Sequence, residues 1–350
     1  MGGILCVTPK SAVVPSQTIE LLTVVPTAES ISRIGTVEVQ MFDRTNNVGL
    51  AGIPINELSA CFPIGGTIVP SATNLLWLYS KYNEFPDVGG WNGFLEEISA
   101  KMKYEITYID CQPFINGPPS DLNTVYTALL CSVEKTQSLG QVTTFVTFDQ
   151  PLYFKARDVL ASRQGDPKHQ NVVIRLGGFH LLMSYMGAIG FIMEGSGLAE
   201  LFNTIYAEHS TQKVMTGHAY ARAVRAYLLA HRALSELMFE EIDILPDCEL
   251  EIEQLFYGKD RSDILTACDK DDKDCTKELT KQFKDRLQNL ISLGPTAKLW
   301  GQYFQMVTLM INFITAERTG NWKLHLETVY QMLPYFHSSG HYLYAKCGQL

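Results

Sequence analysis

The sequence Gln141-Val-Thr-Thr-Phe-Val-Thr-Phe-Asp-Gln-Pro151 decides the fold that we expect for this chain. After Gln141 its residues are β-branched or aromatic up to Asp149, which predicts a buried strand that ends at this aspartate. Because proline is well tolerated in a first helical turn, a helix should follow and run to about Arg163. A second buried strand is predicted for Asn171–Leu176. Strand, helix and strand at this spacing form a βαβ unit with parallel strands.

The sequence on either side of this unit places it in a larger α/β chain. Thr36–Phe42 alternates in hydrophobicity and predicts a further strand before the unit. After the unit, the pattern is helical almost without a break from Leu181 to Phe239. Near the end, Asn321–Tyr335 predicts a helix that is interrupted near Pro334. The predicted fold class is therefore α/β, with a sheet core and a large helical body.

The charge of the chain is divided unevenly along the sequence. The 350 residues are 46% hydrophobic and carry a net charge of −9, and a bulk charge of this sign is not typical of nucleic-acid-binding proteins. Residues 236–286, however, contain 16 acidic and 8 basic residues, so this acidic block alone carries −8. Residues 151–232 carry nine basic and five acidic residues. The bulk charge therefore does not exclude a nucleic-acid partner for the basic middle of the chain.

The cysteines and the hydrophobic segments indicate the compartment. The eight cysteines lack the dense spacing of a secreted disulfide scaffold, which favours reduced thiols in an intracellular protein. Neither a secretory signal nor a membrane span is predicted, so we expect a soluble protein. The chain stops inside an amphipathic helix that has no capping signal, which is typical of a fragment.

Two polar residues follow the two predicted parallel strands, at the edge where open α/β sheets place their ligands. Asp149 is interpreted in two ways: it caps the helix that begins at Pro151, or it is an oxygen ligand for Mg²⁺. A metal site needs at least one further carboxylate, and none lies at the neighbouring strand end. His180 follows Gly177-Gly178 and is predicted to orient a phosphate or move a proton. The alternative, which these residues alone favour, is a hydrogen-bonded core histidine.

Other motifs point to packing or to phosphate contacts. The runs Gly187-Ala-Ile-Gly190 and Gly195-Ser-Gly197 fit neither a dinucleotide nor a P-loop motif, so we expect close helix packing and a turn there. Arg222, Arg225 and Arg232 recur at helical spacing. They are interpreted either as one face that follows a phosphate backbone or as an ordinary solvated face.

Several motifs resemble those of a known group of proteins. The segments that carry the resemblance are Pro118-Pro-Ser-Asp121, Phe145–Ala156, Val173–His180, Gly217–Arg225 and Asn321-Trp-Lys-Leu-His-Leu326. In these segments the chain is similar to transposon-derived animal proteins, which in turn resemble DDE-type transposases of the hAT kind. The resemblance covers most of the chain.

The resemblance implies a ribonuclease H-like mixed sheet core with a large α-helical insertion. Residues 1–186 would be the core without its first catalytic strand, residues 187–300 the insertion, and residues 301–350 returning helices, so that the chain is cut at both ends. Asp149 would match the second metal-binding aspartate, and His180 the histidine after the fifth strand. The closing glutamate would be Glu317 or Glu327, or it would lie beyond Leu350.

The function that the resemblance implies is that of a nuclear DNA-binding protein. Its intact parent would cut or transfer DNA strands with Mg²⁺ or Mn²⁺, with Asp149, His180 and Glu317 as catalytic residues. Arg175, Arg222 and Arg225 are predicted to contact DNA. Because the first aspartate is missing, we expect little or no nuclease activity from these residues.

Two alternatives stay open at this point. One is a catalytically inert, domesticated module that binds DNA or a protein, with the acidic block 236–286 as its protein-binding part and a homo-oligomer as an open option. The other is a small-molecule enzyme, which only the βαβ edge supports.

Overall fold

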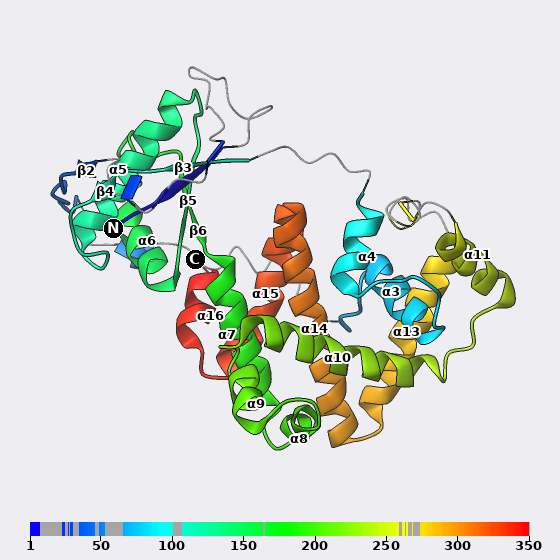
Figure 1. Cartoon of the computed structure of the whole chain (residues 1–350). Coiled ribbons are helices and arrows are strands. Elements are labelled where there is room, and N and C mark those ends of the chain that lie inside the picture. The colour runs from blue at the N-terminus through cyan, green and yellow to red at the C-terminus, as the bar shows by residue number, and fades with distance from the viewer. Residues whose placement is uncertain are drawn as a thin grey trace. The chain divides into compact units, whose positions relative to one another are not determined.

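The computed structural model divides into two compact units, which are described separately. Unit 1 comprises Met1–Leu58, Lys103–Leu181 and Lys346–Leu350, and unit 2 comprises Ser59–Met102 and Leu182–Ala345 (Figure 1). The structure describes residues 1–7, 23–24, 27, 29–30, 35–45, 49–52, 66–100, 107–163, 165–258, 261–262, 264, 268 and 274–349.

Unit 1 is a mixed α/β structure. Its elements are β1 (Ile4–Val7), β2 (Thr36–Val37), a 3₁₀ helix (Gly49–Gly52), β3 (Tyr108–Cys111), β4 (Phe114–Ile115), α5 (Leu122–Ser138), β5 (Thr144–Phe148), α6 (Gln150–Ser162) and β6 (Val172–Leu176). Within the described part of the chain the strands pair two by two, β1 antiparallel to β3, β2 parallel to β4 and β5 parallel to β6. The predicted βαβ unit with parallel strands is therefore confirmed.

One face of the β5–β6 pair forms the core of unit 1. Phe148 and Ile174 are buried on this face and pack against residues of α5 and α6 such as Val125 and Val159. The opposite face is open to solvent, because Phe145 is 68% exposed and its partner Val173 is 37% exposed. The prediction of two fully buried strands is therefore wrong for one face. Apolar residues stand on both faces of these strands, so the sequence hides the alternation that burial follows.

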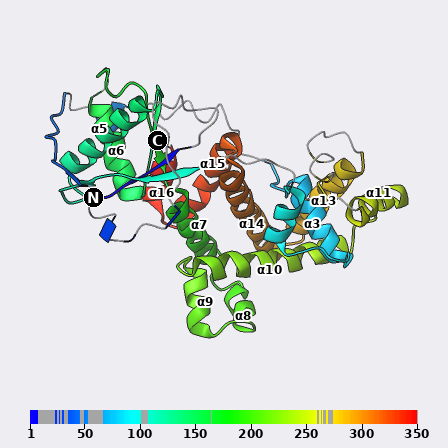
Figure 2. The same cartoon turned by 45° about the horizontal axis from the view of Figure 1, so that its top comes forward.

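Unit 2 is built from helices. They are α3 (Ala72–Tyr82), α4 (Trp91–Ile98), α7 (Gly178–Ile192, which begins in unit 1), α8 (Leu198–Asn203), α9 (Glu208–Met215), α10 (Tyr220–Phe239), α11 (Pro246–Tyr257), α13 (Asp274–Ser292), α14 (Pro295–Thr319), α15 (Trp322–Ser338) and α16 (Tyr342–Gln349, which ends in unit 1). Helix α14 packs against both α13 and α15 (Figures 1 and 2).

Helix α15 corrects one detail of the sequence analysis. The predicted interruption near Pro334 is wrong, because α15 continues through this proline to Ser338. Leu333 and Phe336 are buried on either side of Pro334. Their packing offsets the hydrogen bond that the proline cannot donate.

The core of unit 2 contains tyrosines whose hydroxyl groups are all paired. Tyr185, Tyr227 and Tyr303 are fully buried. Each hydroxyl donates to a backbone carbonyl: Tyr185 to Met306 at 3.2 Å, Tyr227 to Met186 at 3.0 Å, and Tyr303 to Tyr227 at 3.1 Å. These bonds fix the side chains of α7, α10 and α14 against one another, because an unpaired buried hydroxyl is unfavourable.

Glycines allow α7 to pass very close to the turn between α9 and α10. A Cβ atom on Gly190 would lie 2.0 Å from the carbonyl oxygen of Met215, and a Cβ on Gly217 would lie 2.1 Å from that of Met183. Gly217 also has a φ of +76°, which side chains rarely adopt. The predicted close helix packing at Gly187–Gly190 is therefore confirmed.

The structure also bears on membranes and thiols. In the described part of the chain, no helix combines the length and the hydrophobicity that a membrane span requires. Seven of the cysteines lie among the described residues, and all seven are free thiols.

Candidate functional site

The carboxyl ends of β5 and β6 lie side by side in unit 1. The N–H of Gly177 donates to the carbonyl oxygen of Phe148 at 2.7 Å, directly beyond the paired residues Phe148 and Leu176. A Cβ on Gly177 would lie 3.1 Å from that oxygen, so glycine suits this close approach. Asp149 follows the first strand end and α7 begins at Gly178 after the second. The segments that carry Asp149 and His180 therefore share one edge, as predicted.

Asp149 caps helix α6. Its Oδ1 accepts a hydrogen bond from the N–H of Leu152 at 3.2 Å, and Pro151 occupies the first turn. The capping interpretation of the sequence is thus confirmed, and the carboxylate is exposed rather than buried at the strand end. Capping satisfies one of the backbone donors that a helix start leaves without a partner.

The donor set around Asp149 does not fit a firmly held metal ion. Among the described residues there is no group of three or more His, Cys, Asp or Glu side chains that could hold one. Mg²⁺ bound by protein normally takes at least one or two carboxylates together with waters or phosphates. The role of Asp149 as a metal ligand stays a prediction, and no step below depends on it.

His180 lies in the first turn of α7 and is exposed. Its ring makes an edge-on contact with the ring of Phe179, with the centroids 5.4 Å apart. The alternative of a buried core histidine is therefore wrong. An exposed imidazole next to a strand end is accessible to a phosphate, and this role stays a prediction.

Glu317 lies on α14 in unit 2, whereas Asp149 and His180 belong to unit 1. Its Oε1 is 2.7 Å from Nδ1 of His325, and the side chain of His325 is only 8% exposed. The imidazole stacks on Trp322 with the ring centroids 4.9 Å apart and an angle of 9°. Glu317 therefore has a structural partner within its own unit, where it joins α14 to α15.

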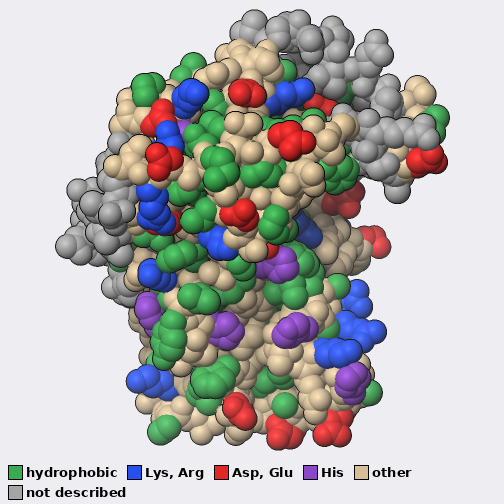
Figure 3. Space-filling model, turned by 90° about the vertical axis from the view of Figure 1, so that its left-hand side faces the viewer, with side chains coloured by type: hydrophobic (Ala, Val, Ile, Leu, Met, Phe, Trp, Pro, Cys, Tyr) green, Lys and Arg blue, Asp and Glu red, His purple; other side chains and the backbone are tan. Residues whose placement is uncertain are grey.

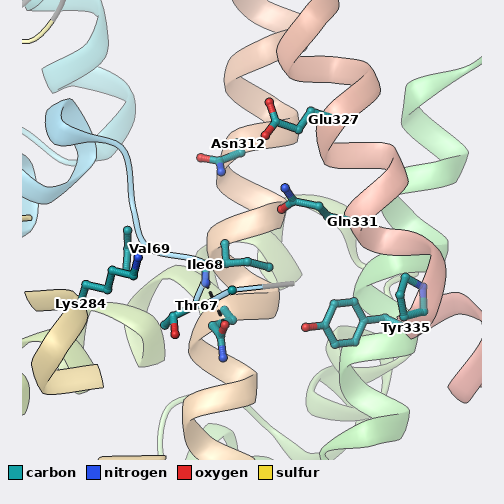
Figure 4. A pocket seen from close by; sticks show the side chains of 11 residues that line it. Thr67, Ile68, Val69, Lys284, Asn312, Glu327, Gln331 and Tyr335 are labelled. Carbon is teal, nitrogen blue, oxygen red and sulfur yellow. Dashed lines mark hydrogen bonds between the residues drawn. The ribbon is translucent and has the colours of Figure 1, made fainter. Parts of the chain in front are cut away.

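Glu327, the other candidate for the closing glutamate, lies on α15 and lines a pocket of about 530 Å³ in unit 2. In Figure 4 the amides of Asn312 and Gln331 lie near Glu327, while Tyr335 and Lys284 line other parts of the pocket, and no second carboxylate is among its lining residues.

Arg222 and Arg225 are exposed on the first two turns of α10. Nη1 of Arg222 donates to Oγ of Ser210 at 3.3 Å, which links α10 to α9. Helix α9 carries the exposed side chains of His209 and Lys213. We call the surface formed by His209, Lys213, His218, Arg222 and Arg225 the α9–α10 basic face.

In Figure 3 histidine side chains and some lysine and arginine side chains are scattered over the lower half, and carboxylates lie along its bottom edge. Because a turn separates α9 from α10, helical spacing does not group His209 and Lys213 with the arginines. Helical spacing does group Arg232 with them, but Arg232 instead pairs with Glu236 at 2.7 Å.

Arg175, the third predicted DNA contact, differs from these arginines. It is half-buried in β6, opposite Thr147 of β5, and belongs to unit 1. The exposed arginines of α10 are better placed to meet a phosphate backbone than this strand residue.

One strongly altered acid–base group of unit 2, His231 of α10, lies outside all the motifs described above. Burial lowers the pKa of His231 to about 3, so its imidazole is neutral near pH 7. Nε2 lies 3.0 Å from Oγ1 of Thr308, and the ring stacks on Phe304 with centroids 3.9 Å apart. No motif surrounds His231 in the sequence; the only signal is its place on the apolar face of α10.

Comparison with known proteins gives one relationship. No curated protein matches the chain, and no solved structure matches it either. A family model described as a domain of unknown function, DUF8702, matches residues 90–350, from the start of α4 to the end of the chain. This match spans most of the sequence and includes both strand ends, the α9–α10 basic face and the pocket residues of α13, α14 and α15, but not Gly66–Val69. The chain therefore belongs to the DUF8702 family.

Proposed function

We propose that this chain is a DNA-binding protein of transposase-like ancestry, with a ribonuclease H-like arrangement in unit 1 and without strand-cleaving activity of its own. The resemblance of its motifs to transposon-derived proteins motivates the proposal. The observation that carries it is the α9–α10 basic face, where Lys213, Arg222 and Arg225 are exposed together.

The charge of this face agrees with a phosphate ligand. The net charge of the chain is −9, but the acidic residues are concentrated in residues 236–286. Around the basic face the nearest acidic residue in sequence is Glu208, at the start of α9. Lysine and arginine side chains on adjoining helices can neutralise successive phosphates, and this contact would be independent of base sequence.

The catalytic part of the proposal is restricted to the parent protein. Asp149 and His180 share the strand-end edge, which agrees with the resemblance, but Asp149 already accepts the hydrogen bond from Leu152. We therefore infer a domesticated module that binds DNA in the nucleus, and Mg²⁺ or Mn²⁺ belongs only to the intact parent.

The proposal is tested by measuring the affinity for a fluorescent DNA duplex as a function of salt. We expect the logarithm of the binding constant to fall linearly with the logarithm of salt concentration. Arg222→Ala combined with Arg225→Ala should weaken binding for every duplex sequence and reduce the salt slope by about 1.8, since each lost phosphate contact contributes about 0.9.

The matched control changes the same charge elsewhere. Lys281 and Lys323 are exposed on α13 and α15. Lys281→Ala combined with Lys323→Ala should leave the slope near that of the unchanged chain. Equal effects of the two pairs, or an affinity that does not depend on salt, would remove the basic face from the proposal. Cleavage of the duplex in Mg²⁺ that is lost in Asp149→Ala would overturn the inert module.

A second candidate function is binding of a protein partner through the acidic block. On α11, Leu250 is 55% exposed and Tyr257 is 62% exposed, beside the exposed carboxylates of Asp247 and Glu251. Exposed apolar groups bordered by one sign of charge fit a partner segment with apolar and basic side chains. An arginine- and leucine-containing amphipathic peptide should bind more weakly to Leu250→Ser than to the unchanged chain, and equal binding would exclude this surface.

A further inference from the structure

The pocket beside Glu327 is lined mainly by polar side chains. Helix α14 contributes Gln305 and Asn312, and α15 contributes Glu327, Gln331 and Tyr335 at successive turns. The extended segment Gly66–Val69 and Lys284 of α13 complete the lining (Figure 4). A volume of about 530 Å³ lies within the range of sites that enclose small organic molecules.

One part of this pocket is already occupied by the chain's own backbone. The N–H of Ile68 donates to Oε1 of Gln305 at 2.9 Å, and Oγ1 of Thr67 accepts from Gln288 at 3.0 Å. These bonds hold the segment against α14 and α13. They also show that a carboxamide of this pocket serves as an acceptor for an N–H group.

The remaining polar side chains have no such partner. Within the described residues, no hydrogen bond or ion pair joins the side chains of Asn312, Glu327, Gln331 or Tyr335 to another group, although all four are half-buried. In Figure 4 the side chains of Asn312, Glu327 and Gln331 come from facing helices and lie near one another. Because these polar side chains line the pocket and have no partner within the described chain, they can bind a ligand that enters it.

The charges select the class of ligand. The pocket carries two charged side chains, Lys284 and Glu327, which lie apart in Figure 4, and the oxygens of Asn312 and Gln331 add further acceptors beside Glu327. At this end of the pocket the carboxylate favours a cation that also donates hydrogen bonds and repels an anion. A metal ion would require further carboxylate, histidine or cysteine ligands, and no group of three such residues is found in the described part of the chain.

We propose that this pocket binds a small organic cation that carries a guanidinium or primary ammonium group, with Glu327 as its counter-ion. The carboxylate of Glu327 accepts the charged N–H groups, and the carboxamide oxygens of Asn312 and Gln331 accept the remaining ones. The ring of Tyr335 supplies an apolar wall for the carbon chain of the ligand. This site is independent of the basic face, which lies on α9 and α10 and would take the opposite charge.

The test uses the full chain and compares butylguanidinium with butylurea, which differ in charge but scarcely in shape; agmatine is a second cationic probe. Butylguanidinium and agmatine should bind saturably by isothermal titration and raise the thermal unfolding midpoint, because a ligand that binds only the folded state stabilises it. Butylurea should bind at least about tenfold more weakly, since it lacks the charge that strengthens hydrogen bonds to a carboxylate. Inorganic phosphate, which carries the opposite charge, should not displace agmatine from the pocket.

Glu327→Gln should weaken binding of agmatine by about tenfold or more, and Asn312→Ala should weaken it by a smaller factor. The matched control is Glu96→Gln, which removes the same charge from the exposed surface of α4 and should bind agmatine as the unchanged chain does. The proposal is overturned if agmatine fails to bind, if butylurea binds equally well, or if phosphate binds in its place. The proposal is also overturned if Glu327→Gln and Asn312→Ala bind agmatine as tightly as the unchanged chain does.

Discussion

Polar side chains are exposed at the strand-end edge of unit 1, whereas in the helical core of unit 2 they are buried and hydrogen-bonded. At the edge, Asp149 and His180 are exposed to water. In the core, Tyr227 and His231 are fully buried, and each has a hydrogen-bond partner. The edge carries the motifs that stand out in the sequence, whereas the core residues belong to an ordinary amphipathic helix.

In this chain burial, rather than membership of a sequence motif, changes the acid–base chemistry of a side chain. At the edge, Asp149 performs the common task of capping a helix. In the core, removal from water lowers the pKa of His231 to about 3 and raises the pKa of Tyr227 far above its ordinary value. We therefore expect substitutions in the core to affect stability more strongly than substitutions at the edge.

The largest effect at neutral pH is expected where α7 passes the turn before α10. Gly190→Ala places a methyl group 2.0 Å from the carbonyl oxygen of Met215, and backbone rather than a flexible side chain would have to move. We expect the free energy of unfolding to fall by about 3 kcal/mol, the upper part of the usual range for overpacking. Urea unfolding followed by near-UV circular dichroism measures this change.

Two glycines with open surroundings serve as controls. A Cβ on Gly93 of α4 meets nothing within 4 Å, so Gly93→Ala should be neutral or stabilising by up to about 1 kcal/mol. Gly195 has a φ of +72°, and a Cβ there would also meet nothing within 4 Å. Gly195→Ala therefore measures the cost of backbone strain alone, whereas an alanine at Gly217 would combine that strain with a steric clash. A loss at Gly190 no greater than at Gly195 would show that the helices are not held this closely.

The next effect concerns the pH dependence that His231 confers. Its pKa is about 3 in the folded chain and about 6.5 when exposed, so only the unfolded chain binds a proton in this interval. Above pH 6.5 neither state is protonated and stability is unaffected. As the pH falls from 6.5 toward 3, stability should decrease by up to about 1.4 kcal/mol per pH unit, and no further below pH 3.

His231→Gln removes this titration while it keeps a group that can bond to Thr308. The free energy of unfolding of the unchanged chain should therefore fall more steeply between pH 6 and pH 4 than that of the variant. Parallel curves for the two proteins would mean that His231 is protonated equally in both states.

The local part of the fold could be predicted from sequence because short segments determine it. The residues Val142–Phe148 and Pro151 specify β5 and the start of α6, and Asp149 is placed to cap that helix. The open face at Phe145 could not be predicted, because exposure depends on what packs against the sheet rather than on the strand itself. The continuation of α15 through Pro334 likewise depends on its buried neighbours.

The candidate sites depend on contacts between distant residues, which composition and spacing do not reveal. The pocket joins Ile68 to Gln305, and the link between α9 and α10 depends on Ser210 and Arg222. From the sequence, Glu327 is one of several candidate glutamates, and nothing in the sequence indicates that amide side chains lie beside it. The sequence likewise does not indicate that Glu317 pairs with His325.

The smallest effect separates the two interpretations of Asp149. Asp149→Ala should lower the free energy of unfolding by about 1 kcal/mol, and Asp149→Asn should preserve it, since asparagine caps helices as well as aspartate. Asp121→Ala, at the matching cap of α5, should lose a similar amount, because Asp121 accepts the N–H of Asn123 at 3.1 Å. If Asp149 also holds a metal ion, Mg²⁺ should stabilise the unchanged chain but not Asp149→Asn. An equal response of both proteins to Mg²⁺ would leave capping as the role of this carboxylate, whereas a stable Asp149→Ala would contradict the cap itself.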